Sequence, residues 1–100
     1  MNSRNYYVYI LASRHHGTLY IGITNDIHTR LVQHRAGRGS EFVKKYGVFG
    51  LVHVEIFATP QEAIAREKQR KFWKRDWKIK LIETENPDWE DRSGLIDQLG

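Results

Sequence analysis

The stretch "NYYVYILASRHHGTLYIGITND", from Asn5 to Asp26, decides the fold of this chain. Two runs rich in tyrosine and β-branched residues, 5–12 and 18–24, flank the polar segment "SRHHG", which predicts two β-strands joined by a hairpin turn. A signal peptide is excluded because three of the seven residues of "YYVYILA" carry phenol hydroxyls and no small-residue cleavage site follows. The chain is therefore expected to begin with a β-hairpin.

The register of this hairpin decides which tyrosines meet. If the turn is symmetric about residues 14 and 15, Tyr9 faces Tyr20 and Tyr7 faces Gly22, with opposed Cβ atoms roughly 5 Å apart. Two interpretations are open. The tyrosines either pack against each other across the strands, or they present two hydroxyls to a ligand.

Capping residues predict two short helices after the hairpin. Asp26 is expected to cap a helix that runs to about Arg35 and ends at Gly37. A shorter helix is expected to start at Ser40 and close at Gly47.

The second half of the chain predicts a third strand and a long helix. Residues 48–57 alternate well enough for a strand. One face of this strand is predicted to hold Val52, Val54 and Ile56. The capping box "TPQE" then starts a helix from Pro60 to about Arg75, and "NPDWE" repeats the device with Asn86 as the cap. At Trp73, Trp77 and Leu81, which recur every four residues, a core stripe is expected rather than a platform for base stacking.

Composition fits one domain, residues 1–100 with a core of about 5–91. The chain has 100 residues, of which 40% are hydrophobic, and it shows no linker or repeat. It has no cysteine, which excludes disulfides and thiolate metal sites and suits a reducing cytoplasm. No segment is expected to enter a membrane.

Positive charge gathers in one block of the sequence. Residues 66–80 carry eight basic and two acidic side chains, whereas residues 81–100 carry one basic and six acidic ones. The block is either a solvated helix face or a surface that binds nucleic acid through cations and exposed aromatic rings.

Three side chains outside the predicted core are candidates for phosphate chemistry. Arg30 and His34 lie four residues apart on one helix, and an arginine there can bind a phosphate with two hydrogen bonds. Glu67 can ligate Mg²⁺, because such ions are often held by one carboxylate, waters and phosphate oxygens. The alternatives are surface residues without a role and an intrahelical ion pair of Glu67 with Lys71 or Arg70. His15 and His16, in the predicted turn, have no third ligand at helical or strand spacing and are expected to be solvated.

These residues together resemble the GIY-YIG nuclease family, and most of all its stand-alone, single-domain bacterial branch. "YVY" at 7–9 takes the place of the GIY motif, "YIG" at 20–22 matches the second motif, and "REKQ" and "NPDW" follow. The resemblance covers about residues 6–89. It departs from the family pattern at Tyr7, which stands where the first motif has glycine, whereas Tyr9 is retained.

The resemblance implies an α+β fold, an α/β sandwich in which helices flank a three-stranded antiparallel sheet. It also implies a divalent-metal-dependent endonuclease that hydrolyses phosphodiester bonds. By resemblance, the catalytic residues are Tyr9, Tyr20, Arg30, His34 and Glu67, and Glu67 is the ligand of Mg²⁺ or Mn²⁺. The expected substrate contacts are Lys68, Arg70, Lys71, Lys74 and Asn86.

The resemblance leaves the general base open. A free tyrosine has a pKa near 10, so only about 0.1% is phenolate at pH 7. For Tyr9 or Tyr20 to act as the base, Arg30 and the metal must favour the phenolate. Otherwise the tyrosine orients a water that the metal or His34 deprotonates.

Two functional hypotheses follow. The first is a cytoplasmic endonuclease of DNA rather than RNA, structure-specific or acting on single strands, in DNA repair or recombination. The second is a non-catalytic domain that binds nucleic acid through the basic helix 60–80. For the nuclease we expect a monomer or a weak homodimer, with targeting by DNA shape or by a protein partner.

Overall fold

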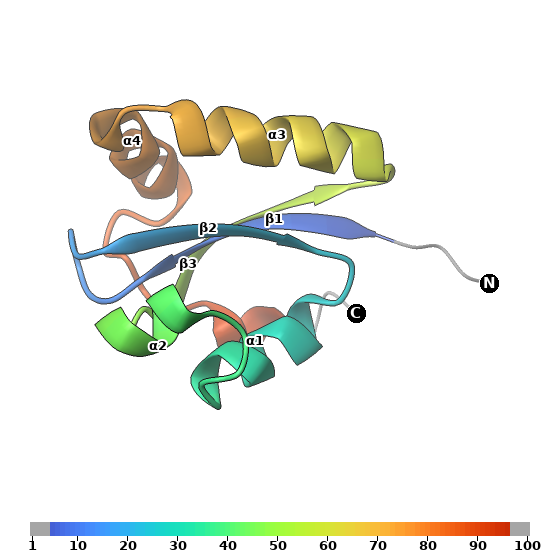
Figure 1. Ribbon diagram of the computed structural model, residues 1–100. Helices are drawn as coiled ribbons and strands as arrows, with labels where there is room; N and C mark the ends of the chain where they lie inside the picture. The colour runs from blue at the N-terminus through green and yellow to red at the C-terminus, as the bar shows by residue number, and fades with distance from the viewer. Residues whose placement is uncertain (1–4, 97–100) are drawn as a thin grey trace.

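The computed structural model describes residues 5–96, which form a three-stranded antiparallel sheet covered by helices on both faces (Figure 1). The elements in chain order are β1 (Tyr6–Ala12), β2 (Leu19–Thr24), α1 (Ile27–Arg35), α2 (Glu41–Tyr46), β3 (Gly50–Phe57), α3 (Pro60–Phe72), α4 (Arg75–Glu85) and the 3₁₀ turn η1 (Ser93–Leu95). The strand order is β2-β1-β3. Helices α3 and α4 cover one face, and α1, α2 and η1 cover the other. The predicted α+β class is confirmed. Within residues 5–96, none of the helices is both long and apolar enough to cross a membrane.

Strand β1 lies in the middle of the sheet and is buried on both faces. Val8, Ile10 and Ala12 pack under α3 and α4, whereas Tyr7, Tyr9 and Leu11 point to α1 and α2. Full burial of an aliphatic side chain of this size stabilises a fold by roughly 1.5–3 kcal/mol. The continuous apolar run of β1 therefore reflects its central position.

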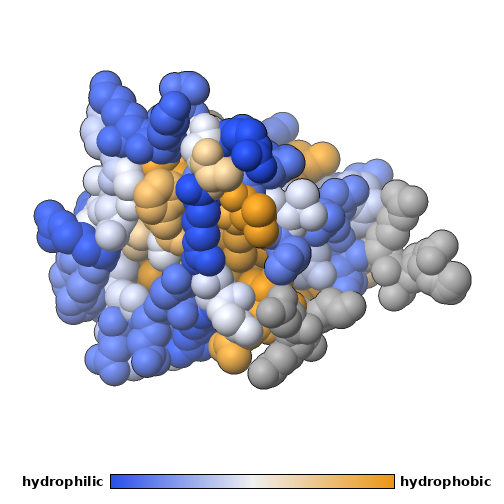
Figure 2. Space-filling view, turned by 90° about the horizontal axis from the view of Figure 1, so that it is seen from below, coloured by the Kyte–Doolittle hydropathy of each residue, from blue (hydrophilic) through white to orange (hydrophobic). Residues whose placement is uncertain are grey.

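The layer of α1, α2 and η1 is thin and leaves apolar side chains at the surface. Figure 2 shows apolar atoms gathered in the middle of this face, with hydrophilic side chains around them. Val32 and Leu95 are each about half exposed there.

The hairpin register differs from the predicted one by two residues. Tyr9 pairs with Gly22 and Leu11 pairs with Tyr20, so the hairpin is symmetric about residues 15 and 16. The turn is longer than expected because Ser13 N–H donates to the Thr18 carbonyl (3.0 Å). A shift of two residues preserves the side of the sheet on which each residue lies. Tyr9 and Tyr20 therefore still share one face, as diagonal neighbours with ring centroids 6.3 Å apart.

Strand β3 contains a bulge that changes the predicted alternation. Ile10 pairs with His53 and Leu11 with Leu51, which leaves Val52 without an opposite partner on β1. Val52 packs in the core beneath α3 and α4, whereas Val54 packs against the other core. The prediction that these valines share a face was wrong, because an inserted residue reverses the alternation.

The predicted starts of three helices are confirmed by side-chain caps. The cap residues Asp26, Ser40 and Thr59 each accept a hydrogen bond from the backbone N–H three residues later. Gly37 and Gly47 follow the ends of α1 and α2 in left-handed conformations, with φ of 78° and 63°.

The basic block is divided between two helices, which corrects the expected single helix to Arg75. Helix α3 ends at Phe72 because Trp73 adopts an extended conformation, and α4 begins at Arg75. The expected core stripe is broken at this corner, and Trp77 is 60% exposed. Asn86 ends α4 and caps no following helix, so that prediction was also wrong.

Candidate active site

Tyr9 and His34 form the centre of the candidate site. Tyr9 Oη lies 2.9 Å from His34 Nε2, and each residue is 1% exposed. Tyr9 comes from β1, and His34 comes from the face of α1 that packs on the sheet. The Tyr20 ring lies edge-on to His34, with centroids 5.3 Å apart. The structure thus brings three of the predicted site residues into one group, the Tyr9–Tyr20–His34 cluster.

Two glycines make room for this cluster. A Cβ atom on Gly22 would overlap Cζ and Oη of Tyr9, because the tyrosine ring lies across the edge strand at its pairing partner. A Cβ atom on Gly39 would lie 2.5 Å from His34 Nδ1. Gly22 belongs to the "YIG" motif, but its steric role was not predicted. Gly39 was missed altogether, because no local pattern connects it with His34.

The second ring nitrogen of His34 is unusual. Among the described residues, Nδ1 is the one buried side-chain nitrogen or oxygen without a hydrogen-bond partner. Such atoms are uncommon in proteins and often mark catalytic groups or sites of bound water. Nδ1 carries a proton when Nε2 accepts from the Tyr9 hydroxyl.

Burial sets the protonation of the pair. It raises the pKa of Tyr9 far above the ordinary range, with further increases from Tyr20 and Glu67 and an opposing effect of Arg30. Burial, aided by the charge of Arg30, lowers the pKa of His34. At neutral pH, Tyr9 is therefore a phenol and His34 is a neutral imidazole. Burial thus opposes a Tyr9 phenolate more strongly than the positive charge of Arg30 favours it.

Glu67 and Arg30 lie near enough to Tyr9 for their charges to shift its pKa in opposite directions. Glu67 projects from α3, its side chain is 14% exposed, and its Oε2 lies 2.6 Å from Lys71 Nζ. The intrahelical pair considered from the sequence is therefore present.

Glu67 is a single carboxylate whose charge reaches Tyr9. Within residues 5–96, Glu67 belongs to no group of three or more potential metal ligands. Mg²⁺ in phosphate chemistry is commonly held by one or two carboxylates, with waters and phosphate oxygens as the remaining ligands. Glu67 is suited to supply such a carboxylate.

Two of the expected substrate contacts, Arg70 and Asn86, are used inside the protein. Arg70 is 4% exposed and binds both carboxylate oxygens of Glu55, at 2.9 and 3.0 Å. The Asn86 amide donates to the carbonyls of Val52 and Glu90. Both side chains stabilise the contact between helices and sheet, and neither presents a free polar group to a substrate.

Exposed cations and aromatic rings of the basic block lie on either side of the corner between α3 and α4. Lys68, Lys71 and Lys74 are exposed there. Phe72 and Trp77 are 88% and 60% exposed. We call these five residues the corner surface. It combines cations and aromatic rings, the two kinds of group with which proteins bind single-stranded nucleic acid.

Comparison with known proteins gives a consistent family assignment. A model of the GIY-YIG catalytic domain matches residues 5–80. A UPF0213 protein of Bacillus pumilus is 37% identical over 83 residues, which cover 83% of this chain and 84% of that protein. A UPF0213 protein of Staphylococcus saprophyticus is 38% identical over 77% of this chain and 93% of its own length. The solution NMR structure of the UPF0213 protein BH0048 from Bacillus halodurans superimposes with a TM-score of 0.56 at 32% identity, covering 91% of this chain and 96% of that one.

Proposed function

The chain belongs to the GIY-YIG catalytic-domain family, and from this premise we propose that it is a divalent-metal-dependent endonuclease that hydrolyses phosphodiester bonds of DNA. The observation that carries the proposal is the buried hydrogen bond between Tyr9 and His34, beside Tyr20 and within the electrostatic reach of Arg30 and Glu67. Buried polar and ionisable side chains such as Tyr9 and His34 are costly to place in a core that serves only stability.

The Tyr9–His34 pair supports a proton relay. In this relay, a water attacks phosphorus and gives a proton to Tyr9 Oη. In the same step Tyr9 passes its own proton to the neutral His34 Nε2. The phosphorus–oxygen bond to the attacking water forms as the bond to the leaving oxygen breaks, and the leaving oxygen departs with the bonding electron pair and takes up a proton from a solvent water. This relay needs no stable phenolate, which agrees with the raised pKa of Tyr9.

Arg30 and Tyr20 serve the phosphate in this scheme. Arg30 keeps its charge at any working pH and can bind two phosphate oxygens, so it stabilises negative charge that develops during attack. Tyr20 lies beside both members of the relay and orients the attacking water.

Glu67 would hold the metal ion. A bound Mg²⁺ or Mn²⁺ supplies a Lewis acid that stabilises charge on the phosphate oxygens. Lys71 pairs with one oxygen of Glu67, and it is 55% exposed and can turn towards a phosphate.

The corner surface favours DNA with unpaired nucleotides as the substrate. Its lysines suit phosphates, and Phe72 and Trp77 offer faces on which bases can stack. We therefore propose nicked, branched or single-stranded DNA as the substrate class, and repair or recombination in the cytoplasm as the setting.

A second candidate function rests on the same corner surface. Its cations and rings would bind nucleic acid whether or not the Tyr9–Tyr20–His34 cluster is active. The alternative is therefore a non-catalytic binding domain that uses residues 60–80.

A cleavage assay separates the two candidates. Labelled duplex, single-stranded, forked and four-way DNAs are incubated with Mg²⁺ or Mn²⁺ and with wild type, Glu67→Gln or Tyr9→Phe. Glu85→Gln is the matched control, because Glu85 is an exposed carboxylate at the end of α4. The nuclease predicts metal-dependent cleavage that wild type and Glu85→Gln perform and the other two lose. Binding of the panel without cleavage under either metal would support the binding domain instead.

A further inference from the structure

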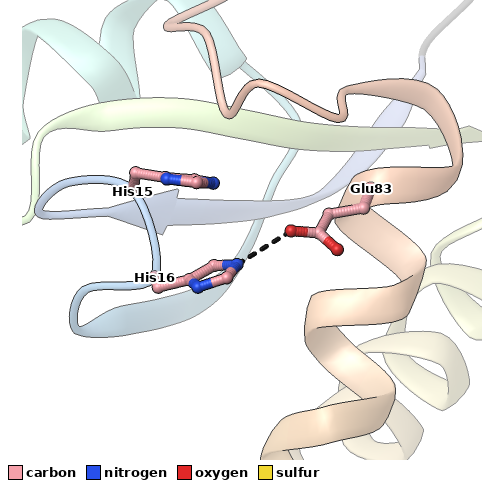
Figure 3. A group of neighbouring side chains, drawn as sticks. All are labelled: His15, His16 and Glu83. Carbon is pink, nitrogen blue, oxygen red and sulfur yellow. Dashed lines mark hydrogen bonds and ion pairs between the residues drawn. The ribbon is translucent and has the colours of Figure 1, made fainter.

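The turn between β1 and β2 places two histidines beside a carboxylate of α4 (Figure 3). His15, His16 and Glu83 each offer one ligand atom, and these atoms all lie within 4.8 Å of one another. The third ligand was invisible in the sequence, because Glu83 lies 67 residues after His16. We propose that His15, His16 and Glu83 form a zinc site that joins the hairpin turn to α4.

The spacing of the three ligand atoms is compatible with a tetrahedral zinc centre once the side chains rotate. Zinc binds imidazole nitrogen and carboxylate oxygen at about 2.0–2.2 Å, so its ligand atoms are roughly 3.3–3.5 Å apart. His16 Nε2 and Glu83 Oε2 are already 2.9 Å apart. Both histidines are exposed, so small rotations can bring the third atom to the ion. Two histidines and one glutamate leave the fourth position to water.

The turn orients the two imidazoles towards one side. Consecutive residues of an extended strand point to opposite faces, which would separate the rings. Here the backbone of His16 adopts the left-handed conformation, with φ of 56°. The two imidazole rings therefore lie side by side, with centroids 4.3 Å apart. Arg75 holds this turn by donating to the carbonyls of His16 and Gly17, at 2.7 and 2.6 Å.

Trp89 supports all three ligands. Its indole N–H donates to Glu83 Oε2 (2.8 Å), and its ring meets those of His15 and His16 edge-on, with centroids 5.5 and 5.1 Å away. Trp89 itself is 7% exposed and packs in the core beneath α3 and α4. Hydrogen bonds of this kind fix metal ligands, and their loss typically weakens metal affinity 10–100-fold.

The ligand set selects zinc over the magnesium proposed for Glu67. Imidazole nitrogen suits Zn²⁺ and related transition metals, whereas Mg²⁺ takes oxygen ligands. The two proposals therefore concern different residues and different ions, and either can fail without the other.

Titration calorimetry of the tag-free chain with ZnCl₂ tests the site. Wild type is expected to bind one Zn²⁺ with affinity that falls at least about tenfold in each of His15→Gln, His16→Asn and Glu83→Gln. Asparagine is chosen at residue 16 because it tolerates the left-handed backbone. Glu67→Gln and His28→Gln are the matched controls and are expected to keep the affinity.

Two further measurements exclude a merely structural effect. Circular dichroism of the zinc-free variants checks that each is folded. In NMR spectra, zinc is expected to shift the imidazole resonances of His15 and His16 and to leave those of His28 in place. Absence of zinc binding at millimolar concentration, equal affinity in all variants, or loss of binding in Glu67→Gln would overturn the proposal.

Discussion

The hydroxyl of Tyr9 and Nε2 of His34 are joined by a 2.9 Å hydrogen bond that ties the central strand to helix α1. The bond lies where a core would ordinarily hold only apolar groups, and both side chains are almost fully buried. Gly22 and Gly39 leave the space that the two rings occupy. The position of each ring is thus fixed by steric contact as well as by the hydrogen bond, which is what a proton relay needs.

Tyr9→Phe tests the relay directly. The substitution removes Oη and keeps the ring, so we expect DNA cleavage to fall at least about 10²-fold. It leaves His34 Nε2 buried without its partner, which is expected to reduce the free energy of unfolding by about 1–3 kcal/mol. Cleavage rates and urea denaturation measure the two effects. Tyr6→Phe, on the same strand, is the control, and an unchanged rate in Tyr9→Phe would exclude the relay.

The pH dependence of cleavage reports on His34. The relay needs a neutral imidazole, and the pKa of His34 is lowered from its ordinary value near 6.5 by burial and by Arg30. We therefore expect kcat/KM to fall with a midpoint below pH 6.5, as His34 takes up a proton. A profile that already falls between pH 8 and 7 would contradict a neutral His34 as proton acceptor.

Gly22→Ala is expected to displace the ring of Tyr9. The new methyl group would overlap the phenol, and forcing extra atoms into a packed site typically costs about 1–3 kcal/mol. Both stability and cleavage should fall. Gly94→Ala is the control, because no atom lies within 4 Å of the Cβ position there. Equal thermal stability of the two variants would show that Tyr9 does not depend on Gly22.

Capping residues predicted where the helices start. The pairing of the strands could not be predicted in this way, because it depends on contacts between residues far apart in the sequence. Asp26 and Thr59 cap their helices through side chains three residues from their partners, so a short motif suffices. The hairpin register instead depends on hydrogen bonds within the turn, such as that between Ser13 and Thr18. A shift of two residues changed every pairing but left Tyr9 and Tyr20 on one face.

The same distinction applies to the candidate site. Arg70 looks like a substrate contact in a basic block, and only the folded sheet shows that Glu55 takes its guanidinium. Glu83 reaches the histidines of the turn from a helix far along the chain. The partners in the Arg70–Glu55 and Glu83–His16 contacts lie far apart in the sequence, so no local pattern predicts them.

Glu55 should make stability depend on pH. Burial alone would raise its pKa, but hydrogen bonds from His53 and Arg70, with their charges, outweigh burial and hold the pKa at about 2. A carboxylate with a lowered pKa stabilises the fold above its unfolded value near 4.5, and this contribution is lost as the pH falls to about 2. The shift corresponds to on the order of 3 kcal/mol at pH 7.

Urea denaturation of Glu55→Gln between pH 7 and 2 measures this effect. The difference in unfolding free energy between wild type and the variant is expected to shrink by more than half between pH 5 and pH 3. Glu41→Gln, an exposed carboxylate on α2, should show a small difference throughout. A difference for Glu55→Gln that is independent of pH would contradict the linkage.

The corner surface should bind single strands through its rings as well as its charges. Trp73 is held under the guanidinium of Arg70, 4.1 Å from its centroid, and Trp77 lies against Trp73 with centroids 5.7 Å apart. Trp77 is therefore a supported ring with an open face. Stacking of one base on such a ring is worth about 1–3 kcal/mol, so Trp77→Ala should weaken single-stranded DNA binding at least about fivefold and duplex binding much less.

Lys74→Gln is the matched comparison on the same corner, because it removes a phosphate contact and keeps the rings. It should weaken both kinds of DNA alike and reduce the slope of log K against log salt by about 0.9 for duplex. Fluorescence anisotropy with labelled single-stranded and duplex DNA at several salt concentrations distinguishes the two variants. If Trp77→Ala weakens both DNAs equally, the ring contributes no stacking, and the corner surface acts through charge alone.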